Sequence, residues 1–339
     1  MTLAAPAWTA WKKWLAASTF AAVTAPLVFA APAAAHAAPT RSDTVRATTT
    51  VNPLASGPAL PTYSAAAEAQ KAAAAAGRTS VAKQIGVIAG QPTAVWLGEW
   101  YDDASLVRVL QAETAAAVRQ KKTAVFVLYA IPARDCAFYS SGGFDVDGYQ
   151  RWTRLIAQTL RGTPAVAIVE PDALSMLGEC DGQGDRPGLI ADAVRVLAEA
   201  GVPSYIDAGN SNWIPPETMA DRLRAAGVSA ARGFSTNVSN FKLTADEQRY
   251  AERLRTLLGG TARYVIDTSR NGRGWTGDWC NPTGVGLGST PRAVSGSGGL
   301  DALLWIKRPG ESDGECNGGP AAGSWYEKAA LDLVALRGA

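Results

Sequence analysis

The chain has 339 residues, with 32 lysines and arginines against 30 aspartates and glutamates, so its net charge is +2 at pH 7. This near-balance predicts no binding to nucleic acid or to another polyanion. Hydrophobic residues make up 47% of the chain and charged residues 18%, which excludes a largely disordered protein. The composition therefore predicts a globular protein with a large buried core.

Residues 1–37 have the pattern of a secretory signal peptide. Lys12 and Lys13 precede an uncharged stretch over residues 14–35, and residues 35–37 form a small-x-small cleavage pattern. The stretch is long enough to cross a bilayer, so a retained membrane anchor is the alternative. Its Ala- and Pro-rich composition and the cleavage pattern favour removal, and therefore an extracellular mature protein that is free of the membrane.

His36 is the only histidine, so cleavage would leave a mature chain without one. Such a chain cannot use a Ser-His-Asp or Cys-His arrangement, an HExxH zinc site or a histidine base. Carboxylates thus become the leading candidates for acid-base chemistry. A hydrolase whose metal ion is bound by oxygen ligands alone is an alternative. No motif in the sequence indicates such a metal site, and we expect neither a metal nor a cofactor.

The four cysteines, Cys136, Cys180, Cys280 and Cys316, are even in number and would be exported to an oxidising compartment. Two disulfides are therefore expected. Of the three possible pairings, the one that joins sequence neighbours closes the shorter loops and is favoured. A zinc site built from all four is the alternative, and the absence of a CxxC pair argues against it.

A Thr-, Pro- and Ala-rich segment over residues 38–62 is expected to be a flexible lead-in. Residues 63–339 have no further low-complexity break, and their length is typical of one large α/β domain, here the catalytic one. We see no appended binding module and expect a monomer.

Short apolar or β-branched runs alternate with helical patterns along this domain. The predicted strands cover residues 94–98, 124–130, 165–169, 203–206, 231–235, 263–266 and 302–306. The predicted helices cover residues 105–121, 147–161, 187–200, 216–226, 244–258 and 324–336. Repeated strand-helix units predict an α/β fold with a parallel sheet, most simply a closed or nearly closed TIM-like barrel. An open doubly wound sheet is the alternative.

Five of the seven predicted strands lead into a loop that carries an acidic residue. The acids in these loops are Asp135, Glu170, Asp172, Asp207, Asp267, Glu311 and Asp313. One such acid is usually a helix cap or an ion-pair partner. Together, on the rim where parallel barrels carry their chemistry, they predict an active-site cleft at the C-terminal ends of the strands.

Aromatic residues accompany the acids on this rim. They are Trp96, Trp100, Tyr129, Trp213, Trp275 and Trp279. Indole rings in loops tend to stack on a ligand when they are exposed. A cleft that mixes indoles with carboxylates predicts a sugar as the ligand.

Seven ordered blocks beyond residue 94 resemble a known family. They are YAIPARDC (129–136), AIVEPDALSML (167–177), YIDAGNSNW (205–213), GFSTNVSNF (233–241), YVIDTSRNG (264–272), WCNPTGVGLG (279–288) and LLWIKRPGESDG (303–314). The blocks resemble glycoside hydrolase family 6, the inverting endoglucanases and cellobiohydrolases, in its actinobacterial secreted type. The resemblance implies a distorted seven-stranded parallel barrel and a β-1,4-glucan substrate. It also implies disulfides between Cys136 and Cys180 and between Cys280 and Cys316.

The resemblance assigns roles to five residues. Asp172 matches the proton donor, which needs a raised pKa, and Asp135 matches the aspartate that raises that pKa and relays a proton. Asp313 matches the residue proposed as base; it is expected to act as the base or as an electrostatic partner, with a water chain through Asp135 as the other route. Tyr129 matches a residue beneath the distorted sugar ring, and Ser141 matches one that positions water.

Further matches imply contacts to the sugar. These residues are Trp96, Asp207, Asn210, Trp213, Asn237, Trp279, Lys307 and Glu311. Asn210 stands where the family has histidine, so a charged imidazole is absent and altered substrate contacts are expected rather than inactivity. Asp267 and Arg270 are expected to form a structural pair.

The mode of cleavage depends on how far two connections, residues 136–147 and 271–300, cover the cleft. Their moderate lengths favour an open cleft and endo-action. A cellobiohydrolase of the same family and a catalytically weak carbohydrate-binding relative are the alternatives.

Overall fold

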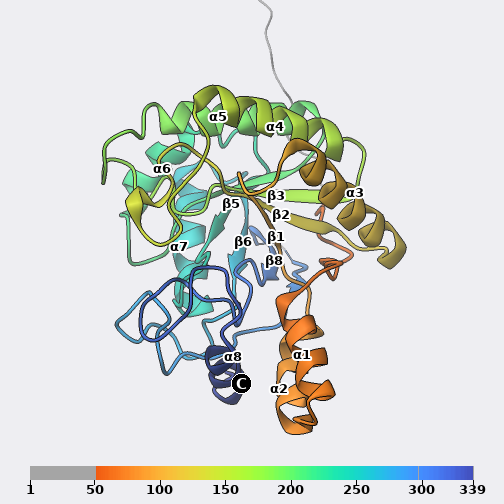
Figure 1. The fold of residues 1–339 in the computed structure, drawn as a ribbon. Coiled ribbons are helices and arrows are strands. Elements are labelled where there is room, and N and C mark those ends of the chain that lie inside the picture. Colours follow the sequence, from red (N-terminus) through yellow and green to blue (C-terminus); the bar gives the residue numbers. More distant parts are fainter. Residues whose placement is uncertain (1–50, 297, 339) are drawn as a thin grey trace, which may run out of the picture. The chain divides into compact units, whose positions relative to one another are not determined.

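The computed structural model describes residues 51–296 and 298–338. The predicted signal peptide and the lead-in up to residue 50 lie outside the described residues. An eight-stranded sheet, curled into a barrel, forms the centre of the described part (Figure 1). The strands are β1 (Val95–Leu97), β2 (Ala124–Leu128), β3 (Ala165–Val169), β4 (Ser204–Asp207), β5 (Gly233–Thr236), β6 (Arg263–Asp267), β7 (Arg292–Ala293) and β8 (Leu300–Leu304).

The sheet order is β1-β2-β3-β4-β5-β6-β8-β7, so the chain winds in one direction around the barrel. All seven predicted strands are present and run parallel, which confirms the predicted α/β barrel. The short β7 was not predicted. It pairs antiparallel with β8 and is only two residues long, too short for a periodic pattern.

The barrel is distorted because β1 and β8 do not form a ladder in the described structure. One backbone hydrogen bond spans the gap, from the N–H of Ala94 to the carbonyl oxygen of Trp305 at 3.1 Å. The indole of Trp96 adds a second, donating to the carbonyl of Ile306 at 2.9 Å. The seam between the first and last parallel strands is therefore joined by these two hydrogen bonds in place of a ladder.

The six predicted helices are confirmed to within three residues at each end. They are α3 (Asp103–Gln120), α4 (Val146–Leu160), α5 (Arg186–Glu199), α6 (Pro216–Ala225), α7 (Thr244–Leu257) and α8 (Glu327–Ala335). Aspartate caps set three of their starts: Asp102, Asp145 and Asp185 each accept a hydrogen bond from a backbone N–H three residues on.

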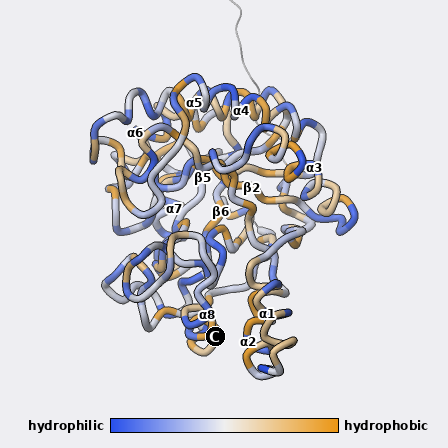
Figure 2. Tube along the Cα trace, in the orientation of Figure 1, coloured by the Kyte–Doolittle hydropathy of each residue, from blue (hydrophilic) through white to orange (hydrophobic). Residues whose placement is uncertain are grey.

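Side chains of the strands alternate between two cores. One set, including Val125 and Ile168, fills the inside of the barrel, and the other, including Phe126 and Ile206, packs outward on the helices. In Figure 2 β2 is coloured mostly as hydrophobic, whereas α4 and α5 alternate between hydrophobic and hydrophilic segments. The strands are thus covered on both faces, as a parallel sheet requires.

A helical hairpin that was not predicted precedes β1. It consists of α1 (Ala65–Ala75) and α2 (Thr79–Ala89), which pack against each other and, through α2, against α8 (Figure 1). The ion pair between Arg78 and Glu327, at 2.6 Å, joins this hairpin to the start of α8. The alanine-rich sequence of α1 has little contrast between apolar and polar faces, so periodicity gave a weak signal there.

The lead-in differs from the expected flexible segment over residues 51–62. Leu54 is fully buried with the side chains inside the barrel, and Asn52 donates to the carbonyl of Asp301 at 2.8 Å. Pro58 pairs with Thr123, just before β2. The segment contains few large apolar residues, which predicted flexibility, but one of them, Leu54, packs inside the barrel. Residues 51–62 are therefore part of the domain.

We predict that Leu54→Ala lowers the free energy of unfolding by about 2–5 kcal/mol, because it leaves a cavity inside the barrel. Leu60→Ala is the control, since Leu60 is 41% exposed and its truncation is expected to change stability by less than about 0.5 kcal/mol. Urea unfolding followed by tryptophan fluorescence measures both. Equal stabilities for the two variants would show that residues 51–62 are dispensable.

Candidate active site

A cavity of about 700 Å³ lies at the C-terminal ends of the strands. Tyr129 follows β2, Asp172 follows β3, Asn210 follows β4, and both Lys307 and Asp313 follow β8. The volume is in the range of sites that hold small molecules or a short run of sugar units. The loops thus converge where the sequence predicts the cleft.

Asp172 carries its carboxyl group into this cavity. Its Oδ1 atom is buried and has no hydrogen-bond partner among the described residues. Burial raises the pKa of Asp172 well above the usual aspartate range, and the nearby charges of Asp207 and Asp135 raise it further. This environment therefore favours the protonated form of the Asp172 carboxyl group.

Asp207 lies just behind Asp172, at the end of β4. Its Oδ2 atom accepts hydrogen bonds from the backbone N–H groups of Asp172, at 3.0 Å, and Gly209, at 3.1 Å, and its Oδ1 atom accepts one from Ser235. Burial raises the pKa of Asp207 to about 7. Asp207 is buried and outside the cavity lining, so it holds the backbone of Asp172 where a sugar contact was expected.

Asp135 and Tyr129 form the second part of the site. The hydroxyl of Tyr129 donates a hydrogen bond to Oδ2 of Asp135, and the ring of Tyr129 lies edge-on to that of Trp96, with centroids 4.9 Å apart. Burial raises the pKa of Asp135, against the lowering effect of the Tyr129 hydrogen bond and of Arg134. Its neighbour Arg134 forms its ion pair with Glu99, at 2.6 Å.

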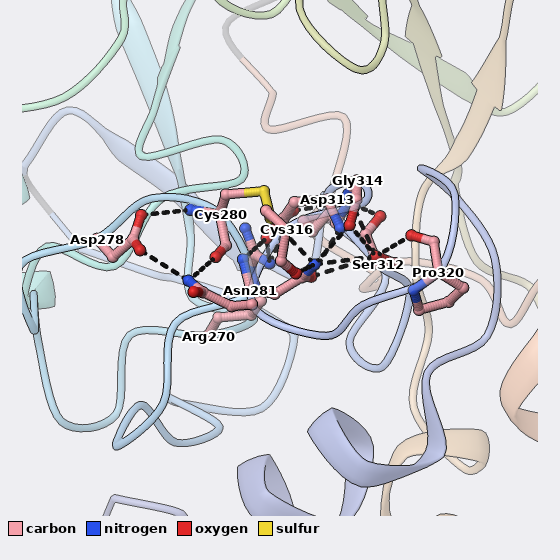
Figure 3. The surroundings of a disulfide bond; sticks show 11 residues. Arg270, Asp278, Cys280, Asn281, Ser312, Asp313, Gly314, Cys316 and Pro320 are labelled. Atoms are coloured by element: carbon pink, nitrogen blue, oxygen red, sulfur yellow. Dashed lines mark hydrogen bonds and ion pairs between the residues drawn. A yellow bond between two sulfur atoms is a disulfide. The ribbon is translucent and has the colours of Figure 1, made fainter.

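Asp313 is an ionised carboxylate held by cations. Arg270 donates to both of its oxygens, at 2.9 and 2.7 Å, and the Nζ atom of Lys307 lies 3.1 Å from Oδ1. Although burial raises the pKa of Asp313, the charges of Arg270 and Lys307 outweigh it and lower the pKa to about 2. In Figure 3 Arg270 and Asn281 lie around Asp313, beside a disulfide.

The expected pair between Asp267 and Arg270 is wrong. Asp267 instead accepts hydrogen bonds from the backbone N–H groups of Ser239, Ser269, Ile306 and Lys307. Asp267 is the last residue of β6 and Arg270 lies in the loop directly after it, so sequence proximity suggested a pair. The arginine reaches the longer loop after β8, which proximity along the chain could not reveal.

Both predicted disulfides are present, and the favoured pairing is confirmed: Cys136–Cys180 and Cys280–Cys316. This excludes the four-cysteine zinc site. Each bridge lies next to a site residue, since Cys136 follows Asp135 and Cys280 follows Trp279. The described part of the chain contains no group of three or more His, Cys, Asp and Glu side chains arranged to hold a metal ion.

Most of the predicted sugar-contacting residues line the cavity. They are Trp96, Asn210, Trp213, Trp279, Lys307 and Glu311, together with Ser141 at its exposed rim. Asn237 does not: it is fully buried, its Nδ2 donates to the carbonyl oxygens of Lys242 and Asp267, and its Oδ1 accepts the N–H of Lys242. Asn237 therefore shapes the loop after β5 rather than meeting a ligand.

Several lining residues were not among the predicted site residues. They are Arg134, Phe138, Tyr139, Ser140, Met176, Glu179, Asn212, Ser239, Asn240, Lys242, Arg308, Ala322 and Gly323, whereas the expected rim indoles Trp100 and Trp275 do line the cavity. Ser239 and Asn240 lie in the loop after β5. This loop contains no acidic residue, so acids after strands did not indicate it. Position directly after a predicted strand was the signal that could have found them.

Three loops of the site meet at aromatic rings. The centroid of Trp279 lies 5.9 Å from that of Phe138 and 6.2 Å from that of Tyr139. Tyr139 also packs on the backbone of Gly314, where a β-carbon would collide with its ring. The connection that carries Ser141 therefore contacts the connections that carry Trp279 and Asp313.

We predict that Asp313→Asn destabilises the protein by about 3–5 kcal/mol at pH 6, because Arg270 and Lys307 lose their buried carboxylate. The folded pKa of Asp313 lies below its unfolded value, so its stabilising contribution is complete above about pH 4 and is lost as the pH falls through about 2. The difference from wild type should therefore narrow towards pH 2.5 in urea titrations. Asp246→Asn, which removes half of an exposed pair with Arg249, is the control. A difference that stays constant with pH would contradict the ionised state.

Comparison with known proteins agrees with this geometry. The family model described as "Glycosyl hydrolases family 6" matches residues 58–337. Endoglucanase A of Cellulomonas fimi is 48% identical over 247 residues, which are 73% of this chain and 55% of that protein. Endoglucanase 1 of Streptomyces sp. (strain KSM-9) is 37% identical over 75% of this chain and 71% of its own length. The chain thus spans about half the length of the Cellulomonas protein.

A solved structure gives the same result. The endoglucanase Cel6 from Mycobacterium tuberculosis, in complex with methyl-cellobiosyl-4-deoxy-4-thio-β-D-cellobioside, has a TM-score of 0.77 and 40% sequence identity, covering 84% of this chain and 98% of that one. The predicted resemblance is therefore confirmed: the chain belongs to glycosyl hydrolase family 6.

Proposed function

We propose that this protein is a secreted, inverting endo-β-1,4-glucanase that cleaves cellulose or a related β-glucan. The observation that carries the proposal is the contrast between two carboxyl groups in one cavity: Asp172 is buried near other acids, whereas Asp313 is paired with Arg270 and Lys307. Asp172 has a pKa raised well above its usual range, and Asp313 has one lowered to about 2. A protonated acid next to an ionised carboxylate is the arrangement that glycosidic cleavage needs.

In this mechanism Asp172 donates its proton to the glycosidic oxygen as the bond to the anomeric carbon breaks. Burial and the nearby charges of Asp207 and Asp135 raise its pKa, which favours the protonated form until the leaving oxygen accepts the proton. Tyr129 and Trp96 supply ring faces beneath the sugar on which cleavage occurs. Lys307 and Glu311 supply polar contacts from the loop after β8.

The role of Asp313 in activating water is restricted by its own ion pairs. A carboxylate with a pKa of about 2 is a weak proton acceptor. We infer that it acts mainly as an electrostatic partner that stabilises positive charge on the sugar ring. The proton of the attacking water then leaves through solvent near Ser141 towards Asp135, whose pKa is raised.

The names of the relatives support endo-action, since the Cellulomonas, Streptomyces and Mycobacterium proteins are all called endoglucanases. The ligand of the Mycobacterium enzyme supports a β-linked glucan as substrate. Two disulfides support an exported, oxidised protein. No helix within the described ranges is long and apolar enough to cross a bilayer.

The first test compares wild type with Asp172→Asn on carboxymethylcellulose. We expect the variant to lose about 10²- to 10⁴-fold in kcat, because an amide cannot donate the proton. Asp181→Asn, an exposed aspartate, is the matched control and should keep wild-type activity. Viscosity measured against reducing ends reports the mode of cleavage. An early fall in viscosity supports endo-action, release of disaccharide at nearly constant viscosity indicates action from chain ends, and binding without hydrolysis would overturn the enzyme assignment.

The second test follows the configuration of the product. Inversion at a β-linked anomeric carbon releases the α-anomer first, before mutarotation. Proton NMR recorded during hydrolysis of a soluble cello-oligosaccharide separates the two anomers. Initial release of the β-anomer would contradict an inverting mechanism while leaving hydrolysis itself established.

A further inference from the structure

Arg134, directly before Asp135, is buried, and its side chain makes four hydrogen bonds. Its NH1 and NH2 atoms donate to the two carboxylate oxygens of Glu99, at 2.6 and 2.9 Å. NH1 also donates to the carbonyl of Tyr129 at 2.6 Å, and Nε donates to that of Ser140 at 2.8 Å. This bidentate pair fixes the plane of the guanidinium group.

Glu99 also binds the far end of the loop that Arg134 begins. Its Oε1 atom accepts the N–H of Gly143 at 3.0 Å, and the N–H of Arg134 donates to the carbonyl of Gly142 at 3.1 Å. A β-carbon on Gly142 would collide with the carboxylate of Glu99, so the loop passes directly against the pair. One carboxylate from the end of β1 therefore closes a loop over residues 134–143.

This loop needs external support. Asp135, Cys136 and Ala137 have φ angles of +56°, +48° and +70°, a left-handed conformation that costs free energy in residues other than glycine. The disulfide at Cys136 holds one side of the loop. The Glu99–Arg134 pair holds its two ends, and the loop carries both Asp135 and Ser141.

The Glu99–Arg134 pair also fixes the position of the positive charge of the Arg134 guanidinium group. The Arg134 guanidinium stacks on the ring of Tyr129 at 4.5 Å and lies 5.7 Å from that of Trp100. Other charges act on the neighbouring Asp135: Arg186 at the start of α5, Lys307 in the loop after β8, and Asp172 across the site. The charge of Arg134 also acts on Asp135, since it lowers the pKa of that carboxyl group.

We propose that Glu99 is a positioning residue: through Arg134 it fixes the loop over residues 134–143 and keeps a cation from pairing with Asp135, so that Tyr129 and Asp135 stay aligned with Asp172. This inference rests on the proposed glucanase function. Glu99 itself is only partly exposed and acts through Arg134, without transferring a proton.

The test substitutes Glu99→Gln, which keeps the shape and removes the charge. We expect kcat on a soluble β-glucan to fall about 10- to 100-fold with KM changed by less than about threefold, because alignment and not binding is lost. The alkaline limb of the kcat/KM profile should move to lower pH, because an uncompensated Arg134 favours ionised Asp135 and Asp172. A merely structural role would leave this limb in place.

Glu217→Gln is the matched control, since Glu217 pairs with Arg253 at 2.7 Å on the surface of α6, away from the cavity. It should keep wild-type kcat and pH profile. Gly142→Ala pushes the loop off the pair without changing a charge, so it should lower kcat and leave the alkaline limb unmoved. A Glu99→Gln enzyme that matches the control in kcat and pH profile would overturn the proposal.

Hydrogen exchange separates this inference from the proposed function. Amides of residues 135–143 should exchange at least about tenfold faster in Glu99→Gln and Gly142→Ala than in Glu217→Gln, whether or not the enzyme is active on glucan. Unchanged exchange would overturn the role of the pair. Faster exchange together with a wild type inactive on every β-glucan would support the pair and reject the proposed function.

Discussion

The crowding of two acids, Asp207 and Asp135, around the buried carboxyl group of Asp172 is the constraint on which the rest of the site depends. Burial and like charges oppose ionisation, so Asp172 stays protonated where a free aspartate would not. The parallel barrel makes this possible, because β3 and β4 are neighbours and their ends bring Asp172 and Asp207 together. The hydrogen bond from the backbone of Asp172 to Asp207 then fixes the distance at which this repulsion acts.

Asp313 has the opposite environment within the same cavity. Arg270 and Lys307 neutralise it, and Asn281 aligns it through hydrogen bonds to its backbone and side chain. The Cys280–Cys316 bridge joins the two loops that carry these groups. One side of the cavity therefore contains several acidic groups, and the other contains carboxylates paired with cations. As a result, two carboxyl groups in the same cavity have different proton affinities.

The sequence predicted the parts of this arrangement that follow from local pattern. Seven strands, six helices and the acids after the strands are periodic or positional signals, and the family blocks added the pairing of the cysteines. The predictions that were wrong concern contacts between parts of the chain that are distant in sequence. Arg270 binds Asp313 rather than Asp267, and the buried side chain of Asn237 binds backbone groups instead of lining the cavity. Leu54 fills the barrel although its polar neighbours predicted a flexible segment. These contacts depend on tertiary packing, which cannot be predicted from a residue and its neighbours in the sequence.

The lack of histidine in the described domain leaves carboxyl groups to set how the protein responds to pH. Burial raises the pKa values of Glu170 and Asp207 to about 7, so the folded state binds more protons than the unfolded state between about pH 4 and 7. Their contribution to stability falls as the pH rises through this window, whereas that of Asp313 falls only below about pH 4. The acids that keep Asp172 protonated and the ion pairs that keep Asp313 charged thus favour the folded state together in mildly acidic solution, where both carboxyl groups also have the protonation that glycosidic cleavage needs.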